Sequence, residues 1–351
     1  MSMTSNPSND PRPFDRAIAV NTFLRPLAAH LDDAAVTEIA IVRPGECYSR
    51  VRGAWVLHEC PALTYPHLEA LATALAAYNH MAKSPILSVV LPGGERGQIV
   101  QPPACIDGTL AVNIRKHAQA AFTLETLQAQ GAFDAVDDAA ARAAAGGMSP
   151  MDQNLLKLKA SGNIPAFLHA AILARKNIVV AGATGSGKTT FARSLIDRVP
   201  VDERLITIED THELMLPRHR NRIHLMYGGV RGRVSATDAL AACMRLSPDR
   251  IFLAELRGPE TWDYLAALNT GHPGSVTTTH ANSAADTFDR LAVLIKQSPT
   301  GGNLDLATIQ AFLRHTVDIV LYFERFQLKE LWFTPHAALL DTPAPAALQT
   351  C

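Results

Sequence analysis

The stretch Asn177-Ile-Val-Val-Ala-Gly-Ala-Thr-Gly-Ser-Gly-Lys-Thr-Thr190 decides the fold of this chain. Ile178 to Ala181 is a short apolar run of the kind that forms a buried central strand. It leads into a complete G-x-x-x-x-G-K-[ST] loop, and residues 190–198 then have the pattern of an amphipathic helix. Strand, glycine-rich loop and helix in this order predict a phosphate loop that binds a nucleoside triphosphate.

Each residue type in this loop suits phosphate binding. The glycines allow consecutive backbone N–H groups to turn toward the phosphates, and the start of the helix adds its positive dipole end. We expect Lys188 to reach the β- and γ-phosphates of ATP and the Thr189 hydroxyl to be a Mg²⁺ ligand. The alternative is a glycine-rich turn without a ligand. The predicted nucleotide-binding residues are Gly182, Ala183, Thr184, Gly185, Ser186, Gly187, Lys188, Thr189 and Thr190.

The composition is that of an ordinary globular protein. A length of 351 residues predicts two domains, and a net charge of −1 gives no general attraction to nucleic acid or anionic membrane. The five cysteines are scattered and never in C-x-x-C spacing, which argues against a cysteine zinc site and a disulfide framework. A polar N-terminus and the lack of a long apolar run predict neither a signal peptide nor a spanning helix. We therefore expect a cytoplasmic protein that can still dock on a membrane.

The pattern of apolar runs and turn residues predicts the domain organisation. Residues 1–13 are expected to be disordered, and 14–133 to form an α+β domain with helices against a mostly antiparallel sheet. An Ala- and Asp-rich linker is expected at 134–150, followed by an α/β domain with a mainly parallel sheet at 151–330 and a tail at 331–351. The expected strands of the second domain are 178–181, 205–209, 251–254, 275–279 and 317–323.

Two acidic motifs follow the phosphate loop, each where an apolar strand ends. Glu209 and Asp210 end the strand 205–209, where carboxylates suit Mg²⁺ or an attacking water, although a helix cap is the alternative. Glu255 ends the strand 251–254 in a Walker B arrangement, which holds the Mg²⁺ shell or orients water toward the γ-phosphate. Arg257 is either a phosphate sensor or the partner that keeps Glu255 ionised. The predicted Mg²⁺ ligands are Thr189, Asp210 and Glu255, and the predicted catalytic residues are Lys188, Glu209 and Glu255.

A third motif is Thr270-Gly-His-Pro-Gly-Ser-Val-Thr-Thr-Thr-His-Ala-Asn282, in which His272 and His280 flank a short β-branched strand. A lone histidine is usually a structural hydrogen-bonding residue. Two of them around one strand behind a phosphate loop favour γ-phosphate sensors or interface switches. Both histidines are therefore candidate catalytic residues.

One basic cluster interrupts this otherwise neutral chain, at residues 217–224 and 228–233. It is compatible with contact to a phosphate backbone, an acidic lipid or a partner subunit, and equally with a solvated loop. No aromatic residues alternate with the basic ones, as stacking on single-stranded bases would require. The sequence therefore does not support nucleic-acid binding.

The phosphate loop, the Glu-Asp motif, Ala254-Glu-Leu-Arg257 and the two-histidine motif together resemble the secretion NTPase superfamily of type II and type IV secretion and pili. Three N-terminal segments narrow the similarity to the VirB/Trb-type traffic ATPases of type IV secretion systems, which take part in conjugation and effector export. These segments are Val36–Glu46, Gln101–Ala104 and Asn113–Lys116. The resemblance covers about residues 20–325. Ala254, where type II and pilus relatives usually carry glycine, and the lack of a tetracysteine insert favour the type IV branch.

The resemblance implies an α/β fold in which a smaller α+β N-terminal domain precedes a RecA-like P-loop NTPase domain. It also implies a homohexameric ring with nucleotide between the two domains, reached by arginines of the N-terminal domain. Arg96 and Arg115 occupy the matching positions. An arginine is planar, always charged and bidentate on phosphate, although a surface salt bridge is its more usual role.

The expected function is that of a Mg²⁺-dependent ATPase that converts γ-phosphate loss into motion of its N-terminal domains. The resemblance places it in the cytoplasm and peripherally at the inner membrane, where it acts on other secretion-system proteins in substrate transfer or in channel or pilus assembly. The alternatives are a DNA-stimulated translocase ring, a type IV pilus or type II secretion motor, and a scaffold that binds nucleotide without hydrolysing it.

Overall fold

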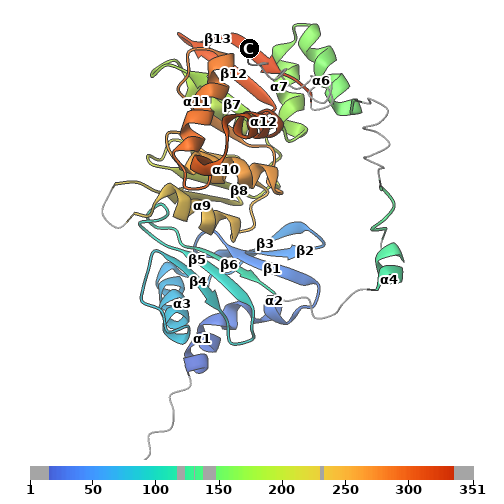
Figure 1. Ribbon diagram of the computed structural model, residues 1–351. Coiled ribbons are helices and arrows are strands. Elements are labelled where there is room, and N and C mark those ends of the chain that lie inside the picture. Colours follow the sequence, from blue (N-terminus) through green and yellow to red (C-terminus); the bar gives the residue numbers. More distant parts are fainter. Residues whose placement is uncertain (1–15, 117–122, 130, 137–147, 230–232, 336–351) are drawn as a thin grey trace, which may run out of the picture. The chain divides into compact units, whose positions relative to one another are not determined.

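The computed structural model describes residues 16–116, 123–129, 131–136, 148–229 and 233–335 (Figure 1). The chain divides into two compact units. Unit 1 comprises residues 1–102 and 108–119, and unit 2 comprises residues 103–107 and 120–351. The predicted disordered N-terminus, most of the predicted linker and most of the predicted tail lie outside the described residues.

Unit 1 is a six-stranded antiparallel sheet with helices packed on one face. The strand order is β3-β2-β1-β6-β5-β4. The strands are β1 (Val36–Ile41), β2 (Glu46–Val51), β3 (Ala54–Glu59), β4 (Ile86–Val90), β5 (Arg96–Val100) and β6 (Ala111–Arg115). The helices are α1 (Arg16–Leu24), the 3₁₀ turn η1 (Arg25–Leu27), α2 (Ala28–Asp32) and α3 (Tyr65–Tyr78).

Helix α3 supplies much of the core of unit 1. It begins at a Thr64 cap, whose side chain accepts from the backbone N–H of His67. Its buried side chains recur at helical spacing, from Leu68 through Leu71 to Leu75. They pack in one apolar cluster with the inward-facing residues of the sheet. The opposite face of this sheet carries a row of charged residues, described below.

Unit 2 contains two sheets built mainly from parallel strands. The first has the order β10-β8-β9 and is parallel; the second has the order β11-β7-β12-β13, with only β13 antiparallel. The strands are β7 (Ile178–Gly182), β8 (Leu205–Glu209), β9 (Arg222–Met226), β10 (Arg250–Leu253), β11 (Val276–Thr279), β12 (Ile319–Glu324) and β13 (Gln327–Phe333). A bridge between Glu255 and Thr278 joins the two sheets where β10 and β11 end.

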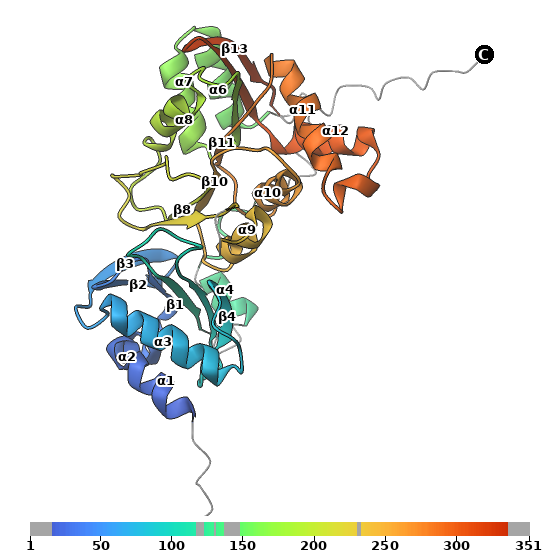
Figure 2. The same cartoon turned by 90° about the vertical axis from the view of Figure 1, so that its left-hand side faces the viewer.

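Helices lie on both sides of these strands. Figure 2 shows α6, α7 and α8 on one side and α10, α11 and α12 on the other. The helices of unit 2 are α4 (Leu124–Ala129), α6 (Pro150–Ala160), α7 (Ile164–Leu173), α8 (Lys188–Ile196), α9 (Ala236–Met244), α10 (Glu260–Asn269), α11 (Ala284–Lys296), the 3₁₀ turn η2 (Gly301–Asn303) and α12 (Leu306–Thr316). Among the residues that the structure describes, no helix is both long and apolar enough to cross a membrane.

Two strands were not predicted. Part of the basic cluster forms β9, an edge strand of the first sheet, so the interpretation of residues 217–224 as a solvated loop is wrong for that part. His219 and His224 are both buried there. Strand β13 runs to Phe333, beyond the predicted boundary at residue 330. Residues 230–232 of the basic cluster lie outside the described part of the chain.

Candidate active site

The phosphate loop has the backbone that its glycines allow. Strand β7 is buried along its whole length, and α8 begins at Lys188, two residues earlier than predicted. Gly187 precedes the helix with a φ of +95°, in the left-handed region that favours glycine. At Gly182, with a φ of +152°, a Cβ would lie 2.2 Å from the carbonyl oxygen of Phe323. Neither position accepts a larger residue without rearrangement, so the glycine pattern of the motif has a steric cause.

Lys188 lies inside this loop. Its Nζ donates to the carbonyl oxygens of Gly182 at 2.9 Å and Ala183 at 2.8 Å. Burial lowers the pKa of Lys188, although the nearby negative charge of Glu255 acts in the opposite direction. The Oγ of Ser186 is buried and has no hydrogen-bond partner among the described residues. The Lys188 ammonium group inside the loop and the unpaired Ser186 hydroxyl are both suited to bind the oxygen of an anion.

A cavity of about 480 Å³ opens beside the loop, within the size range of small-molecule sites. Five of the predicted nucleotide-binding residues line it: Gly185, Gly187, Lys188, Thr189 and Thr190. Sequence reasoning did not predict the other four, which are Arg193, Glu213, Met215 and Phe326. Arg193 lies one turn after the loop on α8, a position that helical spacing could have indicated. Phe326 comes from the turn between β12 and β13, and no local pattern marks it.

Glu255 lies at the centre of a charged network. Its Oε2 accepts from Arg257 Nη2 at 2.6 Å, and its Oε1 pairs with His280 Nε2 at 2.7 Å. Arg257 also donates through Nη1 to Asp210 Oδ2 at 2.6 Å. The hydrogen bond to Glu255 raises the pKa of Arg257 further above its ordinary value, so the guanidinium stays charged. The structure therefore brings together four residues that the sequence singled out in three separate motifs.

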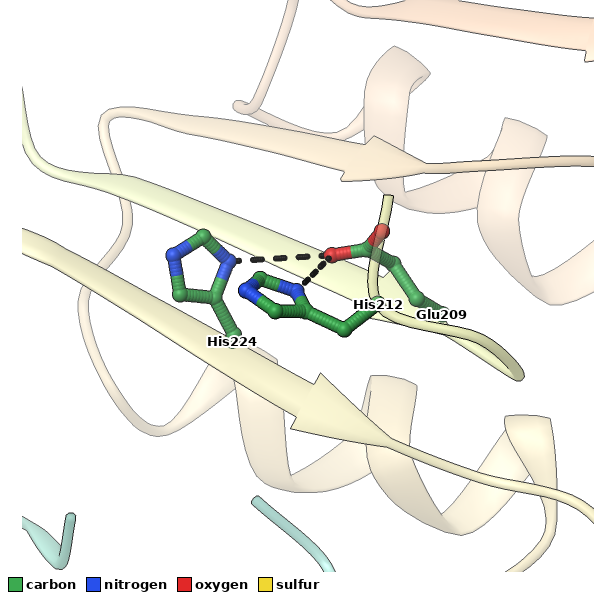
Figure 3. A group of neighbouring side chains, drawn as sticks. All are labelled: Glu209, His212 and His224. Carbon is green, nitrogen blue, oxygen red and sulfur yellow. Dashed lines mark hydrogen bonds and ion pairs between the residues drawn. The ribbon is translucent and has the colours of Figure 1, made fainter. Parts of the chain in front are cut away.

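Glu209 lies in a different environment from Glu255, although both end a strand of the same sheet. Glu209 is fully buried. Its Oε1 accepts from Thr207 Oγ1 at 2.6 Å, and its Oε2 accepts the backbone N–H groups of Glu213 and Leu214 at 2.8 Å each. Two histidines, His212 and His224, lie against the same Oε1 (Figure 3).

These contacts determine the charge of the cluster. Burial alone would raise the pKa of Glu209, but hydrogen bonds from His224, Thr207 and the two backbone N–H groups outweigh it and lower the pKa to about 2. Burial lowers the pKa of His224, so its imidazole is held neutral. A charged carboxylate beside a neutral imidazole is therefore the favoured state.

The two histidines of the third motif lie at opposite ends of their strand. His280 follows the carboxyl end of β11, beside Glu255. His272 precedes the amino end of β11, and its Nδ1 lies 3.2 Å from the carbonyl oxygen of Pro248. Because β11 and β7 are parallel, the phosphate loop that follows β7 lies at the opposite end of the sheet from His272. Within one chain, His272 does not join the network around Glu255.

Arg96 and Arg115 lie directly opposite each other on β5 and β6 of unit 1. Arg115 pairs with Glu38 at 3.1 Å, and Glu38 also accepts from Arg50 at 3.3 Å. Arg96 is exposed and forms no ion pair with another residue in the described part of the chain. Like charges opposite each other on neighbouring strands are normally unfavourable, so this exposed pair suits an anion.

Three arginines of the basic cluster contact the protein's own backbone. Arg233 donates to the carbonyl of Asp210 at 2.7 Å, Arg218 to that of Asp197 at 2.7 Å, and Arg222 to that of His219 at 2.6 Å. Arg233 thereby reaches the segment that carries one carboxylate of the Glu255 network. These contacts give the cluster a structural role in unit 2.

Comparison with known proteins agrees with this site. The family described as "Type II/IV secretion system protein" matches residues 148–321. The type IV secretion system protein VirB11 of Brucella abortus is 41% identical over 336 residues, which cover 92% of this chain and 91% of that protein. A PtlH homolog of Bordetella bronchiseptica is 41% identical over 324 residues, covering 90% and 93%. The crystal structure of the Brucella suis VirB11 ATPase in complex with sulphate matches with a TM-score of 0.85 and 41% identity, covering 92% and 96%.

The fold and the phosphate loop with its charged network define a nucleotide-hydrolysing protein of α/β fold. The chain belongs to the VirB11 family of type IV secretion ATPases. It is accordingly an ATP-hydrolysing enzyme, and the resemblance drawn from the four motifs is confirmed.

Proposed function

We propose that this chain is a Mg²⁺-dependent ATPase that works as a homohexameric ring in a type IV secretion system, with unit 2 as its RecA-like ATPase domain. The proposal is carried by the electrostatic link between the Glu255 network and Lys188 of the phosphate loop. The charges of Glu255 and Arg257 both act on the Lys188 ammonium, so loop and network form one electrostatic unit. The solved relative from Brucella suis is in complex with sulphate, an anion with the shape of phosphate.

We assign the orientation of the attacking water to Glu255 rather than to Glu209. Oε2 of Glu255 makes one short contact, to Arg257, and the Glu255 side chain is 15% exposed, so this carboxylate keeps a further acceptor site for water. The oxygens of Glu209 are buried and already accept from a hydroxyl and two backbone N–H groups. Glu209 is therefore a positioning residue in this scheme, and His280 holds the carboxylate of Glu255 in place. His272 has no role in it.

The residues around the loop also fit a magnesium ion. The Thr189 hydroxyl and the carboxylates of Asp210 and Glu255 are oxygen ligands of the kind that Mg²⁺ prefers. When bound, the ion would neutralise charge on the β- and γ-phosphates. Lys188 would neutralise further charge on the γ-phosphate, and Arg257 forms ion pairs with both Asp210 and Glu255. Gly182 to Thr190 would hold the triphosphate.

Unit 1 supplies the remaining parts of the proposal. Arg96 and Arg115 are proposed to contact the phosphates in the assembled ring. They belong to a proposed N-terminal domain of residues 14–133, which the linker 134–150 joins to the ATPase domain of residues 151–330. The partners are other secretion-system proteins at the inner membrane, which the protein contacts from the cytoplasm.

The proposal is tested by measuring ATP hydrolysis and light-scattering mass on the same samples of wild type and Lys188→Ala. The expected result is a hexamer whose hydrolysis needs Mg²⁺, ignores added DNA and is lost in the variant. Activity without Mg²⁺ would contradict the magnesium assignment. A rate that rises with DNA and falls steeply with salt would instead indicate a translocase ring.

A further inference from the structure

Three potential metal ligands converge beside the carboxyl end of β8. Figure 3 shows Glu209, His212 and His224 pointing toward one another, from the end of β8, the following turn and β9. Glu209 Oε1 lies 3.3 Å from His212 Nδ1 and 3.6 Å from His224 Nδ1. One donor atom of each residue lies within 4.8 Å of the others.

These separations are close to those of a coordination shell. Zinc–nitrogen and zinc–oxygen distances of ~2.0–2.2 Å in a tetrahedral site place neighbouring ligand atoms ~3.3–3.5 Å apart. The two separations from Glu209 Oε1 are already near this value, and because all the donors lie within 4.8 Å of one another, the two rings would only have to move toward each other to share an ion.

The donor set also selects the kind of ion. Two imidazoles and one carboxylate suit Zn²⁺ and related divalent transition metals, whereas Mg²⁺ prefers an all-oxygen shell. The cysteine count could not indicate this site, because none of its ligands is a cysteine. We propose that Glu209, His212 and His224 form a binding site for one Zn²⁺ ion, separate from the proposed magnesium site at Thr189, Asp210 and Glu255.

The surroundings hold the carboxylate ready for a metal. Glu209 Oε2 is fixed by the N–H groups of Glu213 and Leu214, which leaves Oε1 to face the histidines. Ligand carboxylates in metal sites are commonly oriented by such hydrogen bonds. Thr207 Oγ1 lies 2.6 Å from Glu209 Oε1 and 2.8 Å from His224 Nδ1, so it can orient the carboxylate or take the fourth position.

Binding of the ion requires an Nδ1 atom without hydrogen in each ring. In the absence of metal, either Nδ1 can carry a hydrogen that faces the carboxylate or the Thr207 hydroxyl. An Nδ1 ligand must carry no hydrogen, so a ring that holds a hydrogen on Nδ1 must give it up there when the ion binds. The ion thus replaces hydrogen bonds to the carboxylate with bonds to itself.

The consequence would be a fixed turn beside the active site. Asp210 follows Glu209 and pairs with Arg257, while Glu213 lines the cavity beside the phosphate loop. An ion bound to Glu209, His212 and His224 would fix this turn to strands β8 and β9. It would also raise the thermal unfolding midpoint, because a ligand that binds only the folded state stabilises it.

The test is Zn²⁺ binding to the full-length protein after treatment with a chelator, without nucleotide. We expect one Zn²⁺ per chain by calorimetry and metal analysis, retained in millimolar Mg²⁺, and a visible Co²⁺ spectrum of low-symmetry coordination. His212→Gln and His224→Gln should each weaken Zn²⁺ binding at least tenfold. His169→Gln, which changes an exposed histidine on α7, is the matched control and should bind as wild type does.

Circular dichroism melting of the metal-free variants checks their folding. His212 keeps a side-chain exposure of 25%, so His212→Gln is the more tolerant of the two substitutions. The proposal is overturned if the folded wild-type protein does not bind one Zn²⁺ per chain, in which case only hydrogen bonds hold the cluster together. It is also overturned if wild type and His212→Gln bind Zn²⁺ equally well. Because no ATP is present, this result is independent of whether the magnesium and ring assignments hold.

Discussion

The backbone N–H of Phe326 donates a hydrogen bond to the carbonyl oxygen of Ser186 at 3.1 Å, which attaches the turn between β12 and β13 to the phosphate loop. Arg325 and Phe326 both have positive φ, at 48° and 62°, so the turn adopts a conformation that these residue types disfavour. The Phe326 ring occupies the space beside Gly187, where a Cβ would lie 2.7 Å from it. A strained turn with an exposed aromatic ring at the nucleotide cavity is typical of a functional position.

Phe326→Ala is therefore expected to weaken ATP binding by about 2- to 13-fold, as loss of one aromatic contact of ~0.5–1.5 kcal/mol would do. The ring is 73% exposed, so the free energy of unfolding should change little. Fluorescence titration with a labelled nucleotide measures the effect. Trp332→Ala on β13 is the control, and equal affinities for Phe326→Ala and wild type would contradict the prediction.

The buried ion pairs of Lys176 are expected to stabilise unit 2. Its Nζ lies 2.9 Å from Asp152 Oδ1 and 3.2 Å from Asp318 Oδ1, and both carboxylates are nearly buried. Burial alone would lower the pKa of Lys176, but the two carboxylates outweigh it and raise the pKa. Lys176→Met should lower the free energy of unfolding by ~3 kcal/mol, because it leaves two carboxylates without their cation.

Urea unfolding monitored by circular dichroism measures this loss. Lys157→Met, an exposed lysine on the same helix as Asp152, is the matched control and should change stability by less than ~0.5 kcal/mol. Equal stabilities of the two variants would show that the buried ion pairs contribute nothing.

Glu209 predicts a pH dependence of stability. Its pKa is lowered from 4.5 to about 2 in the folded protein, so the charged form stabilises the fold. This stabilisation, ~3 kcal/mol for such a shift, is complete above pH 4.5 and is lost as the pH falls toward 2. The stability difference between wild type and Glu209→Gln should therefore shrink on acidification below pH 4.5. Denaturant unfolding of both proteins over this range checks it, and a difference that does not change with pH would argue against a buried charged Glu209.

Substitution of Arg96 is expected to slow ATP hydrolysis without changing the stability of the fold. Its side chain is exposed, so Arg96→Ala should leave the unfolding midpoint unchanged but lower kcat by ~10²-fold or more, as loss of a phosphate-contacting arginine does. Arg52→Ala, an exposed arginine in the turn between β2 and β3, should retain the wild-type kcat. Steady-state ATP hydrolysis by wild type and both variants, compared at the same oligomeric mass, measures these kcat values. A kcat for Arg96→Ala within twofold of wild type would show that Arg96 does not contribute to hydrolysis.

The residues that the sequence identified are those whose function depends on local order. The phosphate loop was predictable because strand, glycines, Lys188 and helix are contiguous, and each has a steric or electrostatic reason for its place. Glu255 and His280 were each predictable as the residue at the end of a strand. Their contact follows from the parallel arrangement of β10 and β11, which brings strand ends together.

Features that depend on distant contacts could not be predicted. Strand β9 was missed because Arg222 and His224 interrupt its apolar residues, and its burial depends on β8 and on residues 103–107 of the same unit. Glu209 could not be separated from Glu255 by sequence, since both end apolar strands. Only the buried hydroxyl and backbone donors around Glu209 distinguish the two.

The proposed mechanism depends on the orientation of the attacking water by Glu255. Single-turnover hydrolysis and nucleotide affinity, measured side by side for Glu255→Gln and Glu209→Gln, distinguish this role from one at Glu209. We predict that Glu255→Gln binds ATP within about threefold of wild type but hydrolyses it ~10²–10⁴-fold more slowly, the range expected for loss of a positioned base. A wild-type chemical step in Glu255→Gln, together with its loss in folded Glu209→Gln, would contradict the account and transfer that role to Glu209.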